Sequence, residues 1–530
     1  MIWSKKCCLV ILVVVTVALT LRVPQLAKRP MHGDEAVNAV KFGDLLQEGF
    51  YRYNPKEYHG PVLNYFTLIA AWPASAGKLS EIGEFTLRIV PVFFGILLVL
   101  MPLLLTRGLG APAAVLAAAF TAISPAMVFY SRYYIHEMLL VCFTFGVIVC
   151  GFRYTQNRKA VWAILTGLFA GLMYATKETC IIALAAMLLS VLLVLMLEQR
   201  TLRAITKEFE FSHILAGLAT ALAVSALLYS SFFTHPAGIA DSLRAFGIYL
   251  NRASHSTLHI HPWFYYLKML IYSRYGSGPV WSEGVIIVLA VTGFVAAFIK
   301  KYPLDANIPL LRFIALYTFI TTVIYSAIGY KTPWCMLTFL HGMIILAAIG
   351  AAALMRLCPN LFSRITFGVV LTAVGICLIW QAYQSSYTFC SDVRNPYVYA
   401  HTTGDVLKIA ERVERMARLH PDGRNMYIQV ICPNDDYWPL PWYLRRLGRV
   451  GWYDKIDASA PIAPLIIASP AVEAALGRRL YETGSAGSGN LYVPLFERYL
   501  ELRPTVEIAG FVTKDLLDKF QVVYDDSADK

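Results

Sequence analysis

The feature that most constrains the fold of this chain is a series of long stretches without a charged residue. Clear examples are residues 89–106, 111–131, 214–240 and 332–355. Each holds about 18 residues or more, which as a helix crosses a hydrocarbon core of roughly 30 Å. The chain is 57% hydrophobic and only 15% charged, whereas soluble domains carry about 25% charged residues. The sequence therefore predicts a polytopic α-helical membrane protein.

The apolar stretches predict about eleven membrane spans. They lie near residues 7–23, 86–106, 111–130, 137–152, 160–176, 180–197, 214–232, 283–299, 312–329, 334–355 and 365–384. The fifth and sixth are nearly continuous, so we expect a tight hairpin that turns at Lys177 and Glu178. No small-x-small cleavage motif follows the first span, so we interpret it as retained rather than as a signal peptide.

The distribution of lysine and arginine predicts the orientation. A cytoplasmic N-terminus places short basic loops inside, with Arg107, Arg153, Arg158, Lys159, Arg200, Arg203, Lys207, Lys300, Lys301, Arg312, Arg356 and Arg364. Eleven spans then leave the C-terminus outside. The net charge of +12 fits this rule and contact with anionic lipid, and no basic, aromatic segment indicates nucleic-acid binding. We expect a multi-pass protein of the inner or plasma membrane.

Two domains are expected. The membrane domain covers residues 1–384, with outer loops at 24–85, 131–137 and 233–280. In the first loop, apolar periodicity predicts two helices along the membrane interface, near residues 35–49 and 62–72. In the loop at 233–280, an aromatic run at 263–266 indicates an interfacial belt, and His259 and His261 are interpreted as ordinary loop residues.

Residues 385–530 change in character and mix charged helical patterns with short β-rich runs. We expect a helix over 405–419 capped by Thr403, strands over 426–431 and 465–468, and a helix over 470–481. This alternation predicts a small extracytoplasmic α/β domain. Beyond the last span only Cys390 and Cys432 remain, and the sequence leaves open whether they pair in an oxidising compartment.

Ionisable residues recur at the outer ends of the spans, in five separate segments. They are His32, Asp34, Glu35, Lys56, His59, Arg132, His136, Glu137, Lys177, Glu178 and Lys331. Charges beside apolar helices are costly, so they tend to be paired or functional. Carboxylates beside cations suit a phosphorylated ligand, because the cations hold phosphate while a carboxylate accepts a proton.

These residues also have plainer interpretations. Asp34 and Glu35 can simply begin a helix, where the helix dipole favours negative charge. Arg132 and Lys177 can anchor the ends of spans at the interface.

Four motifs resemble those of a known family. They are His-Gly-Asp-Glu-Ala at 32–36, Tyr-His-Gly-Pro at 58–61, Tyr-Lys-Thr-Pro-Trp at 330–334 and Pro-Leu-Pro-Trp-Tyr-Leu-Arg at 439–445. Together with Arg132 and Glu137 at the start of span four, they resemble the GT-C glycosyltransferases. The resemblance is to the protein-mannosyltransferase and lipid A aminoarabinose-transferase branch, and within it to the flippase-activity-associated membrane proteins. It covers most of the chain and is strongest in the first third.

The resemblance implies transfer of a sugar, with inversion, from a polyprenyl-phosphate donor to an acceptor on the outer face. Asp34 would be the general base, Glu35 would support it or hold a metal, and Glu137 would be the family's acidic residue facing the first-loop Asp. Candidates for contact with the donor phosphate or substrate are His59, Arg132, His136, Lys177 and Lys331. His59-Gly60-Pro61 departs from the family, in which relatives often have Lys-Pro-Pro, and this puts the phosphate contact there in doubt.

A divalent metal ion (Mg, Mn or Zn) is chemically feasible at Asp34, Glu137 and His32, because carboxylates and imidazoles are its usual ligands. His136, which precedes Glu137, is a further candidate ligand. The sequence leaves the presence of the metal open.

Two other classes of function compete with an enzyme. A lipid-linked sugar flippase would show internal repeats and polar, broken helices near the midplane, but no repeat relates the two halves of this chain. A scaffold of a glycan-assembly complex would not need the outer carboxylates. Because the ionisable residues lie at one end of the spans, the sequence favours catalysis at the membrane surface. It does not indicate which sugar, polyprenol or acceptor is used.

Overall fold

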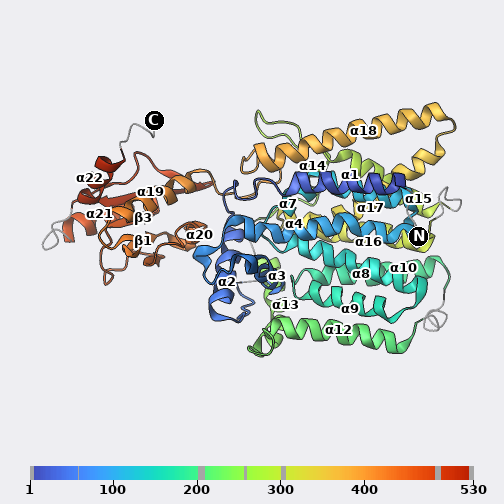
Figure 1. Ribbon diagram of the computed structural model, residues 1–530, viewed down its shortest axis with the longest axis horizontal. Helices are drawn as coiled ribbons and strands as arrows, with labels where there is room; N and C mark the ends of the chain where they lie inside the picture. Colours follow the sequence, from blue (N-terminus) through green and yellow to red (C-terminus); the bar gives the residue numbers. More distant parts are fainter. Residues whose placement is uncertain are drawn as a thin grey trace. The chain divides into compact units, whose positions relative to one another are not determined.

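The computed structural model describes residues 5–57, 59–200, 209–255, 259–299, 306–483 and 491–524 (Figure 1). The chain divides into two compact units. The first contains residues 1–26, 44–76 and 83–399, and the second contains residues 27–43, 77–82 and 400–530. The second unit therefore combines the C-terminal part of the chain with two segments of the first outer loop.

The first unit is almost entirely helical. Seven stretches of its described residues are long and apolar enough to cross a membrane. They are α4 with η3 and α5 (Glu84–Leu109), α8 (Glu137–Asn157), α10 (Cys180–Leu197), α12 (Phe211–Tyr229), α16 (Ile308–Ala327), η4 with α17 (Pro333–Leu357) and α18 with η5 (Leu361–Thr388). The bent pair α6 (Ala111–Ile123) and α7 (Pro125–Ser131) makes an eighth if it is counted as one span. A polytopic helical membrane protein is thus confirmed.

Shorter helices occupy the other expected segments. Three apolar ones, α1 (Lys5–Arg22), α9 (Ala160–Tyr174) and α15 (Gly284–Phe298), fall where further spans were predicted. In the first outer loop, α2 (Gly33–Glu48) and α3 (Val62–Ala71) match the two predicted helices, and the later loop contains α13 (Ala237–His255) and α14 (Tyr265–Ile271). A helix therefore stands at each expected span, while the number that crosses the bilayer stays a prediction.

The packing of the bundle depends on close helix contacts. Helix α9 lies between α8 and α12, whereas α10 packs mainly against α16. A Cβ on Gly167 of α9 would lie 1.9 Å from the carbonyl oxygen of Gly217 in α12, so the two backbones meet directly, as small residues allow in membrane helices. Helix α17 is buried along most of its length, and α12 and α18 lie at opposite edges of the bundle (Figure 1). The helices α9 and α10, which the turn at 175–179 connects, thus pack against different neighbouring helices.

Two buried charges hold the break between α6 and α7, which are bent by 60°. Arg22 donates to the carbonyl oxygens of Ala122 (2.7 Å) and Thr121 (2.9 Å) at the end of α6. At the start of α7, Glu283 accepts the backbone N–H of Ala126 at 3.0 Å. A cation at a helix C-terminus and an anion at an N-terminus both complement the helix dipole. The bend is therefore a built feature, and it sets the direction in which the chain enters residues 132–137.

The second unit contains one sheet of order β2-β1-β3-β6-β4, with β5 paired to β6. Its strands are β1 (Ile428–Ile431), β2 (Val450–Tyr453), β3 (Leu465–Ala468), β4 (Tyr492–Pro494), β5 (Leu500–Arg503) and β6 (Val506–Thr513). Strand β1 pairs in parallel with β2 and β3, and β6 runs antiparallel to β3, β4 and β5. Its helices are α19 (Asp405–Leu419), α20 (Leu440–Tyr443), α21 (Pro470–Arg478) and α22 (Lys514–Val523).

The core of this unit follows the alternation of the strands. Ile428 and Val430 of β1 pack with Val413 of α19, while Ile431 packs on the other face with Leu476 of α21. This burial explains why a small sheet and amphipathic helices form here. The expected α/β region is confirmed, and the observed α19 has the predicted bounds. Its N-cap is Gly404, although the Thr403 hydroxyl accepts the N–H of Asp405 at 3.2 Å.

Several finer expectations stay predictions. The two compact units divide after Tyr399, and the expected membrane domain (1–384) and extracytoplasmic domain (385–530) stay predictions. Cys390 and Cys432 are both free thiols in the structure. Among the basic residues that predict the orientation, Arg203, Lys207, Lys300 and Lys301 lie outside the described residues, as does Tyr58 of the Tyr-His-Gly-Pro motif.

Candidate active site

In the second unit, two adjacent carboxylates at the start of α2 have opposite environments. The Glu35 side chain is fully buried, pairs with Arg29 at 3.0 Å, and accepts the backbone N–H of His32 at 3.0 Å. Its position in the first turn is the one that a helix N-terminus stabilises for an anion. The Asp34 side chain is 56% exposed. Of this pair, only Asp34 can reach a molecule in solution.

The structure also determines which nitrogen of His32 carries the proton. The backbone N–H of Asp34 donates to Nδ1 of His32 at 3.0 Å, so Nδ1 must be unprotonated and the hydrogen lies on Nε2. The Asp34 carboxylate is 4.0 Å from the same Nδ1, which therefore offers it no proton. His32 is buried, and its ring lies 5.1 Å from that of His401. His32 thus supports the backbone of Asp34.

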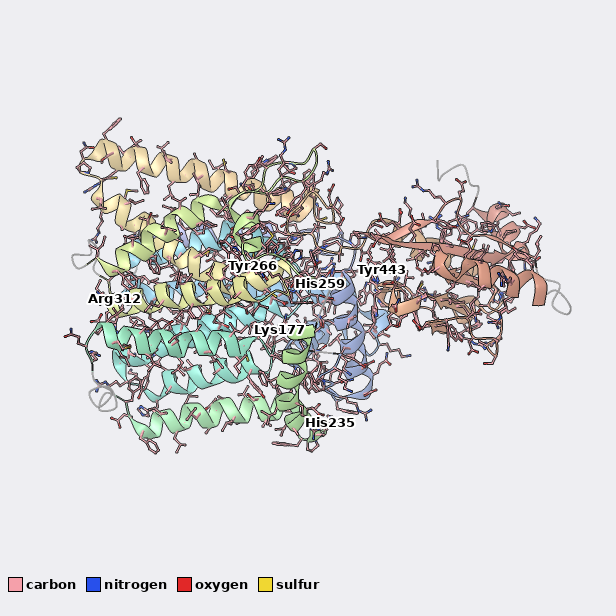
Figure 2. The ribbon with its side chains drawn as sticks, turned by 180° about the vertical axis from the view of Figure 1, so that it is seen from behind. Lys177, His235, His259, Tyr266, Arg312 and Tyr443 are labelled. Carbon is pink, nitrogen blue, oxygen red and sulfur yellow. The ribbon has the colours of Figure 1, made fainter. Side chains whose placement is uncertain are left out.

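In the first unit, Glu137 and Lys177 form a buried ion pair. Glu137 begins α8, and Lys177 lies in the turn between α9 and α10. Their side chains are only 7% and 9% exposed. Figure 2 shows Lys177 at the same end of the helical bundle as His259 and Tyr266, and Arg312 at the opposite end. Two predicted site residues 40 positions apart are thus brought together at one end of the bundle.

A second pair lies next to Lys177 in the sequence. His59 Nδ1 lies 2.8 Å from Oε2 of Glu178, and the Tyr53 hydroxyl donates to Oε1 at 3.0 Å. Burial alone would raise the pKa of Glu178, but the charge and hydrogen bond of His59, with the bonds from the backbone and Tyr53, lower that pKa below its ordinary value. Glu178 is therefore an ionised carboxylate that holds the His59 ring.

His136 joins these elements as a neutral imidazole. Its Nε2 lies 3.1 Å from the carbonyl oxygen of Gly60, which can only accept, so Nε2 carries the hydrogen. Burial, together with the positive charges of His59 and Lys177, lowers the pKa of His136 well below its usual range. Its ring lies 5.3 Å from that of His59. His136 is thus an orienting group for the segment that carries His59.

The Gly60 backbone explains why glycine follows His59. Its N–H donates to the carbonyl oxygen of Thr176 at 3.2 Å, and the N–H of Val62 donates to that of Ala175 at 3.2 Å. A Cβ on Gly60 would lie 2.1 Å from the Ala175 oxygen. Only glycine allows this approach, so the His-Gly-Pro motif is fixed against the turn that carries Lys177 and Glu178.

The Arg132 guanidinium donates hydrogen bonds mainly to backbone carbonyl oxygens. Its Nη1 donates to the carbonyl oxygens of Arg22 (2.7 Å) and Pro24 (2.8 Å) and to the Tyr387 hydroxyl (3.1 Å). Its side chain also stacks over the Tyr387 ring at 4.4 Å. These contacts favour the anchoring interpretation, in which Arg132 secures the end of α1. Its contact with a donor phosphate stays a prediction.

Lys331 has a different environment. Its ammonium donates to the carbonyl oxygens of His261 (3.1 Å) and Ile328, and burial lowers its pKa. No carboxylate pairs with it among the residues that the structure describes. The backbone N–H of Lys331 donates to the carbonyl oxygen of His259 at 3.0 Å, and Nδ1 of the His259 ring is hydrogen-bonded to the Tyr399 hydroxyl. Because carbonyl oxygens carry no net charge, the Lys331 ammonium is a candidate for contact with an anion.

Spacing in the sequence could not reveal Tyr53 and Glu178 as partners of His59. The sequence gives no signal for Tyr53, and it indicates Glu178 as an ionisable residue at the outer face without a partner or a role. Glu178 is 119 residues from His59. The only available signal was the position of Glu178 at the end of a span, beside Lys177.

Two further observations delimit the site. In the described parts of the chain, no group of three or more His, Cys, Asp or Glu side chains is placed to hold a metal ion.

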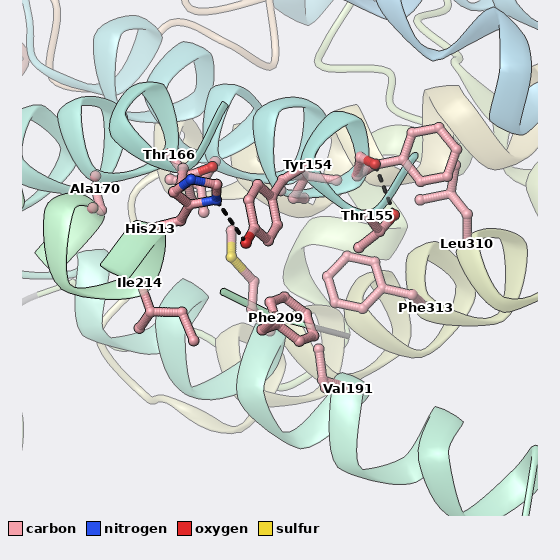
Figure 3. Close-up of a pocket in the computed structure, with 18 of the residues that line it drawn as sticks. Tyr154, Thr155, Thr166, Ala170, Val191, Phe209, His213, Ile214, Leu310 and Phe313 are labelled. Atoms are coloured by element: carbon pink, nitrogen blue, oxygen red, sulfur yellow. Dashed lines mark hydrogen bonds between the residues drawn. The ribbon is translucent and has the colours of Figure 1, made fainter. Parts of the chain in front are cut away.

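An apolar cavity of about 570 Å³ lies between α8, α9, α10, α12 and α16 (Figure 3). It contains the Tyr154–His213 hydrogen bond of 3.3 Å, roughly 25 Å along α8 from Glu137 at 1.5 Å per residue. The cavity is therefore separate from the polar cluster.

Comparison by sequence matches part of the chain to a known family. The family model of dolichyl-phosphate-mannose-protein mannosyltransferases matches residues 59–229. That segment contains His59, Arg132, His136, Glu137 and Lys177. No curated protein matches the chain.

Comparison of structures covers nearly the whole chain. ArnT from Cupriavidus metallidurans bound to undecaprenyl phosphate has a TM-score of 0.64 at 14% identity, covering 94% of this chain and 97% of that one. The archaeal oligosaccharyltransferase AglB from Archaeoglobus fulgidus, in complex with an inhibitory peptide and a dolichol-phosphate, has a TM-score of 0.52 at 13% identity, covering 88% and 70%. At these identities the likeness shows the fold. With the family model, it points to the GT-C glycosyltransferase superfamily, as the motifs predicted.

Proposed function

We propose that this protein is an inverting membrane glycosyltransferase that moves a sugar from a polyprenyl-phosphate-linked donor to an acceptor hydroxyl on the extracytoplasmic face. The GT-C likeness supports the general kind of reaction. The ArnT structure contains undecaprenyl phosphate and the AglB structure contains a dolichol-phosphate, which supports a lipid-linked donor. The acceptor is a protein, a lipid or a glycan.

The observation that carries this proposal is the different environment of Asp34 and Glu35. A general base must come within hydrogen-bond reach of the proton that it removes. Asp34 is 56% exposed, and its backbone N–H is held by Nδ1 of His32. Glu35 is buried on Arg29, so we assign to it the support of this segment and not the base.

The proposed step requires little from the protein beyond a base and positioning. The acceptor oxygen attacks the anomeric carbon while Asp34 takes the hydroxyl proton. The bond between that carbon and the phosphate oxygen breaks, and its electron pair leaves with the polyprenyl phosphate. Attack opposite to the leaving group inverts the anomeric centre. Cations near the phosphate stabilise the charge that develops on it.

Lys331 and Lys177 are our first candidates for the donor phosphate. Lys331 is a buried ammonium bonded to carbonyl oxygens, and Lys177 is held by Glu137. His59, paired with Glu178 and 28% exposed, is a third candidate. We assign His136 to orientation of the His59 segment, and Arg132 to the end of α1.

A divalent ion (Mg, Mn or Zn) at Asp34, Glu137 and His32 stays a prediction. The Nδ1 lone pair of His32 already accepts the Asp34 N–H, so His32 would have to give up that bond to ligate a metal through Nδ1, and Glu137 is paired with Lys177. We derive no step through a metal. Loss of transfer on chelation with EDTA, and recovery with one of the three ions, would establish the requirement.

An assay in detergent separates transfer from transport. Membranes of a strain that lacks this protein would be dissolved in detergent and mixed with the purified protein. We expect the lipid-linked sugar to decrease and sugar-free polyprenyl phosphate to increase, and Asp34→Asn protein to leave both unchanged. A flippase needs two compartments, and a scaffold needs its complex, so either would leave both lipids unchanged with the wild-type protein as well. That result would overturn the proposal.

A further inference from the structure

The Pro-Leu-Pro-Trp-Tyr-Leu-Arg motif at 439–445 has no role in the chemistry proposed above. It contains α20 (Leu440–Tyr443) and lies between β1 and β2 in the chain. The unit that contains it also contains residues 27–43 and 77–82 of the first outer loop. We call residues 439–445 the clamp segment.

The clamp segment contacts the chain directly before Asp34. The backbone N–H of Met31 donates to the Tyr443 hydroxyl at 2.8 Å. The Met31 carbonyl accepts a hydrogen bond from the Thr402 hydroxyl at 2.6 Å. Met31 is fully buried, so water cannot replace either bond. Both backbone polar groups of a residue three positions before Asp34 are thus held by side chains of the C-terminal part of the chain.

A second contact of the clamp segment reaches the other loop segment. Nη2 of Arg445 donates to the carbonyl oxygen of Ile82 at 2.9 Å, and Nη1 donates to that of Trp442 at 2.6 Å. The guanidinium lies 3.6 Å above the centre of the Trp442 ring. The planar fork of arginine and its stacking on tryptophan fix its direction. The clamp segment thus binds the first outer loop at two separate positions.

We propose that the clamp segment positions the general base: through Tyr443, and with Thr402, it holds the backbone that places Asp34. This inference rests on the proposed role of Asp34. An exposed carboxylate is located by its backbone, and the start of α2 is located by Met31 and the bonds of His32 and Glu35. Because a misplacement of about 1 Å can reduce turnover by about a hundredfold, loss of one Met31 bond should impair catalysis without removing any group that touches the substrate.

The first test uses Tyr443→Phe in the full-length protein, which removes only the hydroxyl that accepts the Met31 N–H. Tyr499→Phe is the matched control, because its exposed hydroxyl bonds Glu473 at 2.6 Å in the same unit. We expect Tyr443→Phe to lower kcat about ten- to a hundredfold with an unchanged KM for the lipid-linked donor. Equal activity of the two variants, or a change in KM alone, would overturn the proposal.

A second measurement does not depend on activity. Hydrogen–deuterium exchange should become faster in peptides covering residues 27–36 in Tyr443→Phe, and stay unchanged in the sheet. Thr402→Val, which removes the other bond to Met31 at nearly equal volume, should have the same local effect and replaces Tyr443→Phe if that variant does not fold. Faster exchange throughout the unit would indicate general destabilisation and contradict positioning.

The failure of this inference can be distinguished from failure of the proposed function. In an Asp34→Asn background, Tyr443→Phe should not lower the residual activity further, because the group that it positions is absent. A further loss in that background would contradict the inference. Full activity of Asp34→Asn itself would instead refute the role of Asp34 as base.

Discussion

At the residue scale, we expect substitutions of the neighbouring residues Asp34 and Glu35 to have different effects on the free energy of unfolding. Glu35→Gln removes the negative charge that pairs with the buried Arg29 guanidinium, and breaking a buried ion pair typically costs about 3–5 kcal/mol. Asp34→Asn changes an exposed side chain, for which the free energy of unfolding usually shifts by less than about 0.5 kcal/mol. Thermal unfolding of the purified variants measures the difference. Equal destabilisation of both would contradict the assignment of Glu35 as the support and Asp34 as the base.

Also at the residue scale, Glu178 makes the stability depend on pH. Its folded-state pKa lies below the ordinary value, so its ionised form stabilises the fold above the ordinary carboxyl range, about pH 4.3. This contribution disappears as the pH falls through the lowered pKa. The Tm of Glu178→Gln should therefore lie below that of the wild type at neutral pH, and the gap should narrow on acidification.

Glu48→Gln is the control for that experiment, because Glu48 is exposed at the end of α2. Its Tm should follow that of the wild type at every pH. A gap for Glu178→Gln that widens as the pH falls would contradict an ionised, stabilising Glu178.

At the scale of elements, the contact between the His59 segment and the turn at 175–179 requires glycine at position 60. Gly60→Ala places a Cβ 2.1 Å from the Ala175 carbonyl oxygen, so the backbone must move, and we expect lower Tm and activity. Gly77→Ala is the matched control, since a Cβ there meets nothing within 4 Å. If both variants keep the wild-type Tm and activity, the two segments do not approach as described.

The elements themselves follow mainly from local signals. Charge-free runs predicted each apolar helix, and amphipathic periodicity predicted α19 (Asp405–Leu419) with its observed bounds. The bend between α6 and α7 was not predicted, because it depends on Arg22 and on Glu283, which lies 157 residues from Ala126. Local patterns encode which face of a helix is buried, but not which distant charge meets its end.

At the scale of the whole molecule, the sequence indicates candidate residues but not their partners. Asp34 and Glu137 lie in segments that carry the family resemblance, whereas Lys177 was a candidate because it lies in the turn between two spans, and the chemical roles of all three stay predictions. The partners of His59 and Met31 lie 119 and 412 residues away, and only packing brings them together. The clamp segment was visible as a motif, but its contact with the first outer loop was not.

The central claim is that this chain transfers a sugar and that Asp34 is its base. A strain lacking the protein would receive the wild type, Asp34→Asn or the control Glu48→Gln at matched protein levels. Mass spectrometry would then quantify surface glycans and polyprenyl-linked sugars. We predict that Asp34→Asn lacks one glycan sugar and accumulates its lipid-linked donor, while Glu48→Gln matches the wild type. Full restoration of the glycan by Asp34→Asn would contradict the account.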